Sequence, residues 1–144
     1  MPAQQEGVEF SAVSTEAEIE YVWPAVLPMI ERGLRHGQGD GTTVDVMRHK
    51  VMAGDWLMWA VHEGDDVKAV VILSVNVHAT GKKVFIQMLA GHDMDQWQEE
   101  LQGLLLDFRD VIGAMCIEAS CRKGLVKRLS KLGWREKAVV MELK

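Results

Sequence analysis

The sequence contains few of the residues that staple small proteins or build metal sites. Its 144 residues include only two cysteines, and the one tyrosine is Tyr21. Cys116 and Cys121 are too far apart for a Cys-x-x-Cys redox pair, and no second cysteine cluster completes a zinc site. We therefore expect free thiols, no disulfide framework and no bound metal.

Long apolar runs are also missing. No stretch approaches the roughly 20 apolar residues that span a bilayer. Residues 1–7 are polar and lack the basic and apolar regions of a signal peptide. The sequence thus predicts a soluble protein that has no membrane segment and is synthesised in the cytoplasm.

The sequence has fewer basic than acidic residues, with 16 Lys and Arg against 21 Asp and Glu, which gives a net charge of -5. A domain that follows a phosphate backbone normally has the opposite sign, so nucleic acid is not the expected partner. The remaining composition, 48% hydrophobic and 26% charged, is ordinary for a globular protein. The length fits a single domain over residues 1–144.

The first third of the chain predicts one strand followed by helices. Thr15 and Glu18 have the spacing of a capping box, and apolar residues recur behind them at helical spacing up to Leu34. Pro24 and Pro28 fall inside this apolar stripe, which predicts a kink or two short helices. The other elements expected here are a strand over 8–13, a loop over 33–41, and a helix over 44–52 capped by Thr42 or Thr43.

The rest of the chain predicts a sheet with two more helices. Strands are expected over 56–62, 67–77, 84–89, 114–119 and 138–143, with helices over 95–111 and 122–132. The order β-α-α-β-β-β-α-β-α-β predicts an α/β (α+β) fold, with a mixed, mostly antiparallel central sheet and helices on both faces. A ligand is expected in the crevice between the strands over 84–89 and 114–119.

Isolated reactive residues give weak signals. Five histidines lie thirteen to sixteen positions apart, so they are expected to be solvated surface residues and not metal ligands. Cys121 precedes Arg122 and Lys123 at the start of a helix, and both the helix dipole and these charges are expected to lower the pKa of the thiol. No histidine lies nearby in the sequence to pair with it.

A basic cluster near the end has two interpretations. Residues 122–137 hold seven of the 16 positive charges, whereas residues 93–110 are mainly acidic. The cluster is either the solvated face of an amphipathic helix or a docking surface for an acidic partner, protein or nucleic acid. Five tryptophans and nine methionines also suit an interface. Trp56 and Trp59 are expected on opposite faces of their strand, which would leave one of them exposed.

The end of the chain resembles a known family. The helix over 122–132 followed by Gly133-Trp134 resembles the helix that ends in Gly-Phe or Gly-Tyr in GCN5-related N-acetyltransferases (the GNAT family), and residues 139–143 are similar to that family's final strand. The element order matches over almost the whole chain. More narrowly, Asp55-Trp56, the Leu89-Ala90-Gly91 step and the helix at Trp97 look like features of acetyltransferase-like proteins of tailed phages.

The resemblance implies a place for acetyl-CoA. In the family, Gln/Arg-x-x-Gly-x-Gly/Ala follows the fourth strand, and its backbone N–H groups bind the pyrophosphate. The corresponding residues here would be Gln87, Leu89, Ala90 and Gly91, with Ala90 in place of the first glycine. His92 stands in place of the final small residue.

Other departures argue against catalysis. Asp93 and Asp95 follow the motif, and no Lys or Arg occurs between Lys83 and Arg109 to offset their repulsion of a diphosphate. The family's usual general acid, a tyrosine, corresponds to Leu129. Glu118 or His62 would serve as a base, through water, only if they face the crevice.

These observations predict a GNAT-like phage protein with a degenerate acetyl-CoA site, a non-catalytic virion or morphogenesis component. Its partners would be other virion or phage proteins, or further copies of itself, and it would pass from the host cytoplasm into the particle. The alternative is an active acetyl-CoA-dependent N-acetyltransferase acting on a protein or small-molecule amine. An inhibitor of a host defence enzyme is a third reading, which no residue singles out.

Overall fold

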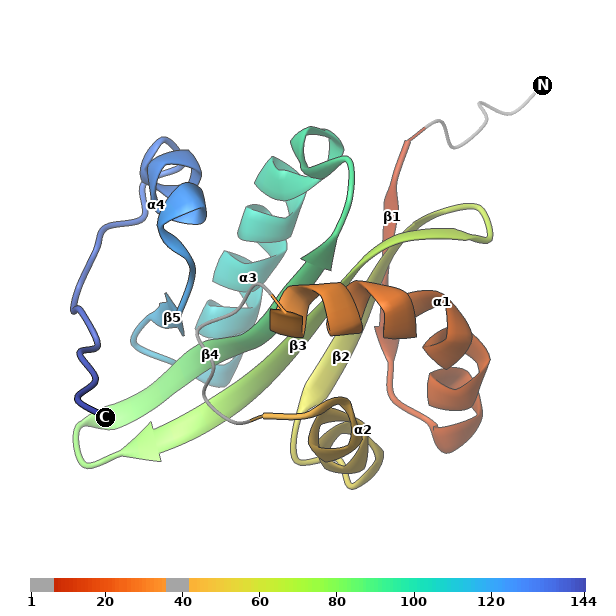
Figure 1. The fold of residues 1–144 in the computed structure, drawn as a ribbon, viewed down its shortest axis with the longest axis horizontal. Coiled ribbons are helices and arrows are strands. Elements are labelled where there is room, and N and C mark those ends of the chain that lie inside the picture. Colours follow the sequence, from red (N-terminus) through yellow and green to blue (C-terminus); the bar gives the residue numbers. More distant parts are fainter. Residues whose placement is uncertain (1–6, 36–41) are drawn as a thin grey trace.

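One five-stranded sheet organises the protein. A computed structural model describes residues 7–35 and 42–144. Their elements are β1 (Glu9–Val13), α1 (Glu16–Arg35), α2 (Val44–Met52), β2 (Leu57–Glu63), β3 (Asp66–His78), β4 (Gly81–Gly91), η1 (Met94–Gln96), α3 (Gln98–Ile112), β5 (Ile117–Ala119) and α4 (Lys123–Ser130). The strands lie in the order β1-β2-β3-β4-β5, antiparallel except for the parallel pair of β4 and β5 (Figure 1).

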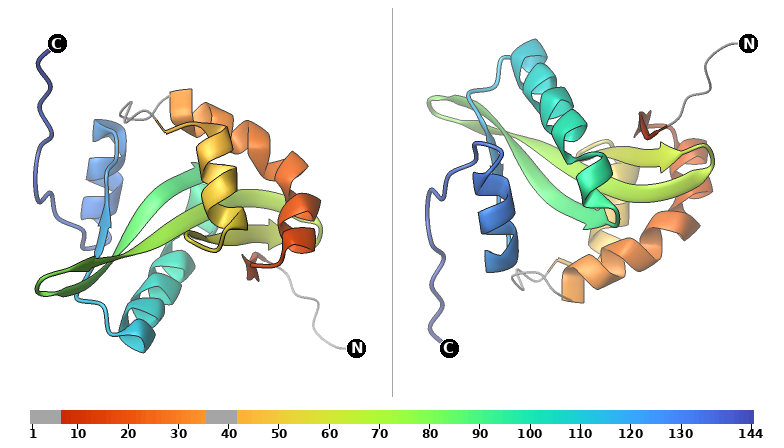
Figure 2. Two further views of the ribbon diagram at one scale, coloured as in Figure 1. Left: turned by 90° about the horizontal axis from the view of Figure 1, so that it is seen from below. Right: turned by 90° about the horizontal axis from the view of Figure 1, so that it is seen from above.

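Helices cover both faces of this sheet, as the sequence predicted. α1 and α2 lie on one face and α3 on the other (Figure 2). Alternate residues of β3 serve the two layers, with Val70 and Ile72 in the cluster under α1 and Ala69, Val71 and Leu73 in the cluster under α3. A strand covered on both faces needs apolar side chains at successive positions, which explains the continuous apolar run.

Local signals at the two N-terminal helices are largely confirmed. The Thr15 hydroxyl accepts a hydrogen bond from Glu18 N at 3.1 Å, and the Glu18 carboxylate accepts one from Thr15 N at 3.0 Å. Thr43 is the cap of α2, since its hydroxyl accepts from Val46 N at 3.2 Å.

The two prolines do not divide α1. Pro24 and Pro28 lie inside one unbroken helix, whose ribbon changes direction along its length (Figure 1). The buried stripe through Ile19, Val26 and Ile30 packs on the sheet across both prolines and holds the helix together. The helix continues to Arg35, so the loop expected over 33–41 starts later, and its residues 36–41 lie outside the described part.

β4 contains a bulge that simple alternation did not reveal. Ile86 pairs with Leu73 and Met88 with Ile72, so Gln87 has no partner of its own on β3. Ile86 belongs to the cluster under α3, whereas Met88, two positions on, belongs to the cluster under α1. The bulge therefore exchanges the two faces of the strand.

The last quarter of the chain is less regular than predicted. β5 has three residues, and the strand expected over 138–143 does not form, because no described strand pairs with it. Val139, Val140, Met141 and Leu143 are 71%, 90%, 89% and 99% exposed. Gly133 does cap the last helix as expected: its φ is 98°, its N–H donates to Ser130 O at 3.1 Å, and Trp134 N donates to Leu129 O at 3.1 Å, which are the two hydrogen bonds of a Schellman motif.

The helix after β4 begins with the short turn η1, and Gly113 ends α3 in a left-handed conformation, as expected. Leu104, expected on the buried face of this helix, is 38% exposed. Trp56 and Trp59 do face opposite layers, but both are half-buried. Among the described residues, each helix is too short or too polar to cross a bilayer.

Candidate functional site at the fork between β4 and β5

The sheet forks where β4 and β5 separate. β5 pairs with only three residues of β4, and the last of these pairs joins Ile86 to Ala119. Residues 88–91 of β4 pair with β3, Gln87 is the bulged residue, and none of residues 87–91 has a partner on the other side among the described strands. This part of β4, called the open edge below, lies where the sequence predicted a ligand.

Backbone groups of the open edge are available to an extended ligand. His92 N donates a hydrogen bond to Lys68 O on β3 at 2.9 Å. Because successive N–H groups of a strand point to opposite edges, the N–H groups of Leu89 and Gly91 point away from β3 and into the fork. Such an edge can pair with an extended chain that carries amide groups.

The side chains of the expected cofactor-binding residues serve the fold. Gln87 Nε2 donates to Ser74 Oγ at 2.9 Å, which turns the amide back onto β3. Leu89 packs in the cluster under α3 and Ala90 in the cluster under α1. A ligand at this edge would therefore meet the backbone of Leu89 and Gly91 and not the side chains of Gln87, Leu89 and Ala90.

Gly91 is required by the approach of β3. Its φ is 152°, and a Cβ placed on it would lie 2.3 Å from Lys68 O and 2.5 Å from the Ala69 Cα atom. No side chain fits at such distances, so this glycine is explained by strand pairing without any ligand.

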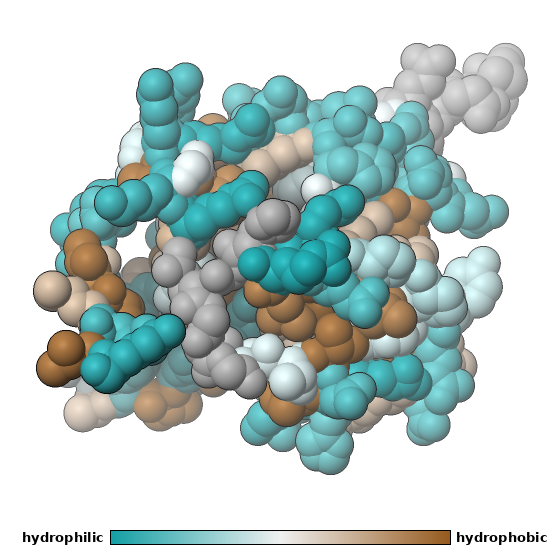
Figure 3. Space-filling view, viewed as in Figure 1, coloured by the Kyte–Doolittle hydropathy of each residue, from teal (hydrophilic) through white to brown (hydrophobic). Residues whose placement is uncertain are grey.

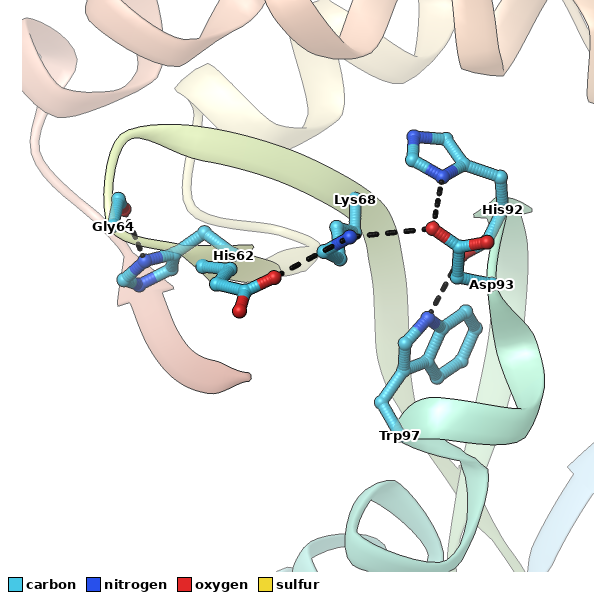
Figure 4. A network of polar contacts seen from close by, with 7 residues as sticks. His62, Gly64, Lys68, His92, Asp93 and Trp97 are labelled. Atoms are coloured by element: carbon cyan, nitrogen blue, oxygen red, sulfur yellow. Dashed lines mark hydrogen bonds and ion pairs between the residues drawn. The ribbon is translucent and has the colours of Figure 1, made fainter. Parts of the chain in front are cut away.

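A cluster of charged side chains occupies the turn after β4 (Figure 4). The Asp93 carboxylate accepts a hydrogen bond from Lys68 Nζ at 3.2 Å and lies 3.0 Å from His92 Nδ1. Lys68 Nζ also lies 3.5 Å from a Glu63 carboxylate oxygen. Trp97, which is 2% exposed, donates from Nε1 to His92 O at 2.9 Å and so holds the turn in place.

These contacts stabilise the charged forms of the pair. The hydrogen bond from His92, and then that from Lys68, lower the pKa of Asp93. The hydrogen bond to Asp93 is the main cause that raises the pKa of Lys68, whose residue is only 7% exposed. Asp93 also has a φ of 57°, the one positive φ among the described non-glycine residues.

The second acidic residue of this turn is paired as well. Arg128 Nη1, on α4, lies 2.8 Å from Asp95 Oδ1. The segment between Lys83 and Arg109 holds no Lys or Arg of its own, but the fold brings Lys68 from β3 and Arg128 from α4 to this turn. The two cations offset part of the repulsion, but they are already bonded to carboxylates.

The candidate proton-transfer residues are not placed for that role. His62 is hydrogen-bonded to Ser11 Oγ at 2.7 Å and to Gly64 O at 2.9 Å, on a strand separated from the open edge by β3. Glu118 lies on β5 near the fork, but contacts with Lys137 and Lys83 lower the pKa of its carboxyl. A carboxylate stabilised in this way is a weak base.

The remaining candidates add no catalytic group. Leu129 is a half-buried residue of α4 and has no proton to donate. Burial, with a smaller contribution from Glu136, raises the pKa of the Cys121 thiol, which corrects the expectation of a lowered value. No group of three His, Cys, Asp or Glu residues within 7–35 and 42–144 is arranged to hold a metal ion.

Several solved structures with this architecture are acetyltransferases. Glucosamine-6-phosphate N-acetyltransferase from Arabidopsis thaliana superposes with a TM-score of 0.68 at 13% identity, covering 96% of this chain and 99% of that one. An aminoglycoside acetyltransferase from an uncultured soil metagenomic sample gives a TM-score of 0.70 at 10% identity and 99% coverage of both chains. The chain has a GNAT-like fold.

A third neighbour extends the GNAT-like comparison. A predicted acetyltransferase from Clostridium acetobutylicum, solved with acetyl-CoA, gives a TM-score of 0.66 at 12% identity, with 95% of this chain and 96% of that chain covered. No protein-family model matches the sequence, and no curated protein sequence matches it significantly. At these identities the likeness establishes the GNAT-like fold alone.

Proposed function

We propose that this GNAT-like protein has a degenerate acetyl-CoA site and acts by binding other proteins, as a component of a phage particle or of its assembly. The observation that carries the proposal is the Asp93 carboxylate in the turn after β4. In the family that this chain resembles, the backbone of this turn binds the pyrophosphate of the cofactor.

Charge at this turn disfavours a diphosphate. A carboxylate about 4 Å from a phosphate charge repels it by roughly 1 kcal/mol in water and by more where solvent is excluded. Lys68 and Arg128 are bonded to Asp93 and Asp95. To bind a phosphate, either cation would have to leave its carboxylate uncompensated.

Acid catalysis is disfavoured independently. Leu129 stands where the resemblance implies the tyrosine that protonates the leaving thiolate, and Tyr21 lies on α1 with 80% of its surface exposed. Glu118 is bonded to two lysines. The function supported best is therefore one that needs neither pyrophosphate binding nor proton transfer.

Thermal melts with and without millimolar acetyl-CoA test the degenerate site. A ligand at about 100 times its Kd stabilises a folded protein by roughly 2.7 kcal/mol, which is a shift of several degrees. We expect no shift for the wild type, and we expect Asp93→Asn, which removes the charge, to gain one. A clear shift for the wild type would contradict the proposal, and ADP as a second ligand would show whether phosphates or the pantetheine arm cause it.

The role in a particle has a separate test. Mass spectrometry of purified virions is expected to detect the chain in a fixed ratio to the major structural proteins. A chain that is absent from virions and stays monomeric when purified would overturn that role.

An active acetyl-CoA-dependent N-acetyltransferase is the second candidate. It is favoured by the open edge of β4, where the N–H groups of Leu89 and Gly91 face the fork and can pair with a pantetheine arm. Incubation with acetyl-CoA and a panel of peptide and small-molecule amines, followed by mass spectrometry of the amines, tests this function. Turnover above the rate without protein would establish it.

A further inference from the structure

Most of the positive charge near the end of the chain is not neutralised. Of the seven cations between residues 122 and 137, Arg128 contacts Asp95 and Lys137 contacts Glu118. The other five are exposed, and none forms an ion pair with a described carboxylate. They are Arg122, Lys123, Lys127, Lys131 and Arg135.

Two of these cations lie on one face of α4, and Lys131, the C-cap residue of the helix, continues their row. Lys123, Lys127 and Lys131 are four residues apart, a spacing that places side chains on the same side of a helix. They are called the lysine stripe below. Lys123 also lies in the first turn of α4, which has no acidic residue, so its charge opposes the helix dipole. Both effects are relieved when carboxylates bind along the stripe.

An exposed apolar segment follows the stripe in the chain. Residues 138–143, called the tail below, run along the same edge of the molecule as α4 and β5 (Figures 1 and 2). Apolar side chains of this segment are uncovered at that edge in Figure 3, and Val139, Val140 and Met141 are at least 71% exposed. β-forming residues with no described strand beside them can pair with an extended chain.

We infer that the lysine stripe and the tail form one docking surface for an acidic, extended segment of a partner protein. Carboxylates of that segment bind Lys123, Lys127 and Lys131, and its backbone pairs with the tail while its apolar side chains cover Val139 and Met141. The inference rests on the proposed protein-binding function and specifies the chemistry of the partner.

Several features favour an acidic peptide over nucleic acid. Trp134 is the one aromatic residue after Phe108, and its indole donates to Gln102 Oε1 at 2.8 Å and packs under α3, so it offers no base a stacking surface. The chain as a whole has a net charge of -5, which repels a long polyanion. α4 is eight residues long, or about 12 Å, and spans few phosphates.

Fluorescence anisotropy with a labelled peptide of alternating Glu and Val tests the surface directly. We expect this peptide to bind at low salt, with an affinity that falls as the salt concentration rises. A Lys and Val peptide of the same length should not bind. The double variant Lys123→Glu/Lys127→Glu should weaken binding about tenfold or more. Arg32→Glu/Arg35→Glu, two exposed charges of α1, is the matched control and should change binding less than about twofold.

The tail has its own measurement. Val139→Asp/Met141→Asp should weaken binding of the Glu and Val peptide although the lysine stripe is intact, because the variant removes apolar surface and adds negative charge that repels the peptide. Amide hydrogen exchange should show residues 139–141 unprotected in the free protein and protected once the peptide is bound. Protection in the free protein would mean that the tail is already paired and would overturn the inference.

Other outcomes also decide the matter. The inference fails if the Glu and Val peptide does not bind, or if single-stranded DNA binds the stripe more tightly than the peptide does. It also fails if Lys123→Glu/Lys127→Glu and the control Arg32→Glu/Arg35→Glu weaken peptide binding equally. These results are distinct from the acetyl-CoA melt. A melt shift with peptide binding retained overturns the degenerate site alone, and no shift without peptide binding overturns the docking surface alone.

Discussion

The chain before residue 106 and the chain after it differ in how deeply their apolar residues are buried. Every described apolar residue that is fully buried lies between Val13 and Leu105, in the two clusters on either side of the sheet. After Leu105 the apolar residues are half-buried or exposed. The first region thus has its own core on both faces of the sheet, and the second region packs against it.

The second region is attached by polar contacts and by partly buried apolar residues that pack on the cluster under α3, among them Phe108, Ile112, Ile117 and Trp134. Gln102 Nε2 donates to Leu132 O at 2.7 Å, and Gln102 Oε1 accepts from Trp134 Nε1 at 2.8 Å. The ion pair of Arg128 with Asp95 adds a third link, from α4 to η1. α4 has no buried residue and the apolar residues of the tail are exposed, so the comparison teaches that these two segments are more open to rearrangement by a partner than the sheet and its core.

The largest effect is expected where β4 crosses closest to β3. Gly91→Ala places a Cβ 2.3 Å from Lys68 O in a backbone conformation that disfavours side chains. We expect a loss of about 4 kcal/mol in the free energy of unfolding, because strand pairing and the turn at Asp93 must shift together. Urea denaturation followed by circular dichroism measures this.

Gly103→Ala is the matched control for that substitution. A Cβ at this position of α3 has no neighbour within 4 Å. The change should stabilise the protein by roughly 0.5–1 kcal/mol through helix propensity. Equal losses for the two variants would show that the first effect is not due to the close strand contact.

The next effect compares the two regions directly. Ile72→Ala, at a fully buried position of β3, should lower the free energy of unfolding by about 3 kcal/mol, because it removes buried apolar surface and leaves a cavity. Leu129→Ala in half-buried α4 should cost about 1 kcal/mol, and Val140→Ala in the exposed tail less than about 0.5 kcal/mol. A cost for Val140→Ala similar to that of Ile72→Ala would mean that the tail is packed in solution.

The smallest effect concerns the charge pair at the turn. The folded pKa of Asp93 is lower than its ordinary value of 3.8, so the pair stabilises the native state above that pH and the contribution is lost as the pH falls through the folded pKa. Melting temperatures from neutral pH down to about pH 3 should therefore fall more for wild type than for Asp93→Asn. Asp107→Asn, at an exposed position of α3, should follow the wild type throughout.

Signals that depend on near neighbours were readable in the sequence. The capping box at Thr15, the alternation of β3 and the glycine that ends α3 all act within a few residues, so the order of elements and the mixed sheet could be predicted. The strand expected over 138–143 was wrong because composition shows β propensity and not the presence of a partner strand.

Signals that depend on distant neighbours were not readable. Lys68 and Asp93 are 25 positions apart, and Arg128 and Asp95 are 33 apart. Two acidic residues without nearby cations therefore suggested unrelieved repulsion, although the fold supplies a partner to each. The pKa direction of Cys121 failed for the same reason, because burial depends on packing around the residue and not on Arg122 and Lys123 beside it.

The bulge at Gln87 determines how the gene for this protein can change length. Deleting one codon there would restore plain alternation with Met88 still facing α1 and Leu89 still facing α3, so each layer would keep its side chains and the strand would lose only the bulge and the contact of Gln87 with Ser74. The turns at Gly64 and Gly81 connect strands whose pairing is fixed by their own residues. A change of length in either turn therefore stays local. At position 87, a one-residue deletion would likewise leave every core residue in the rest of the strand on its own face.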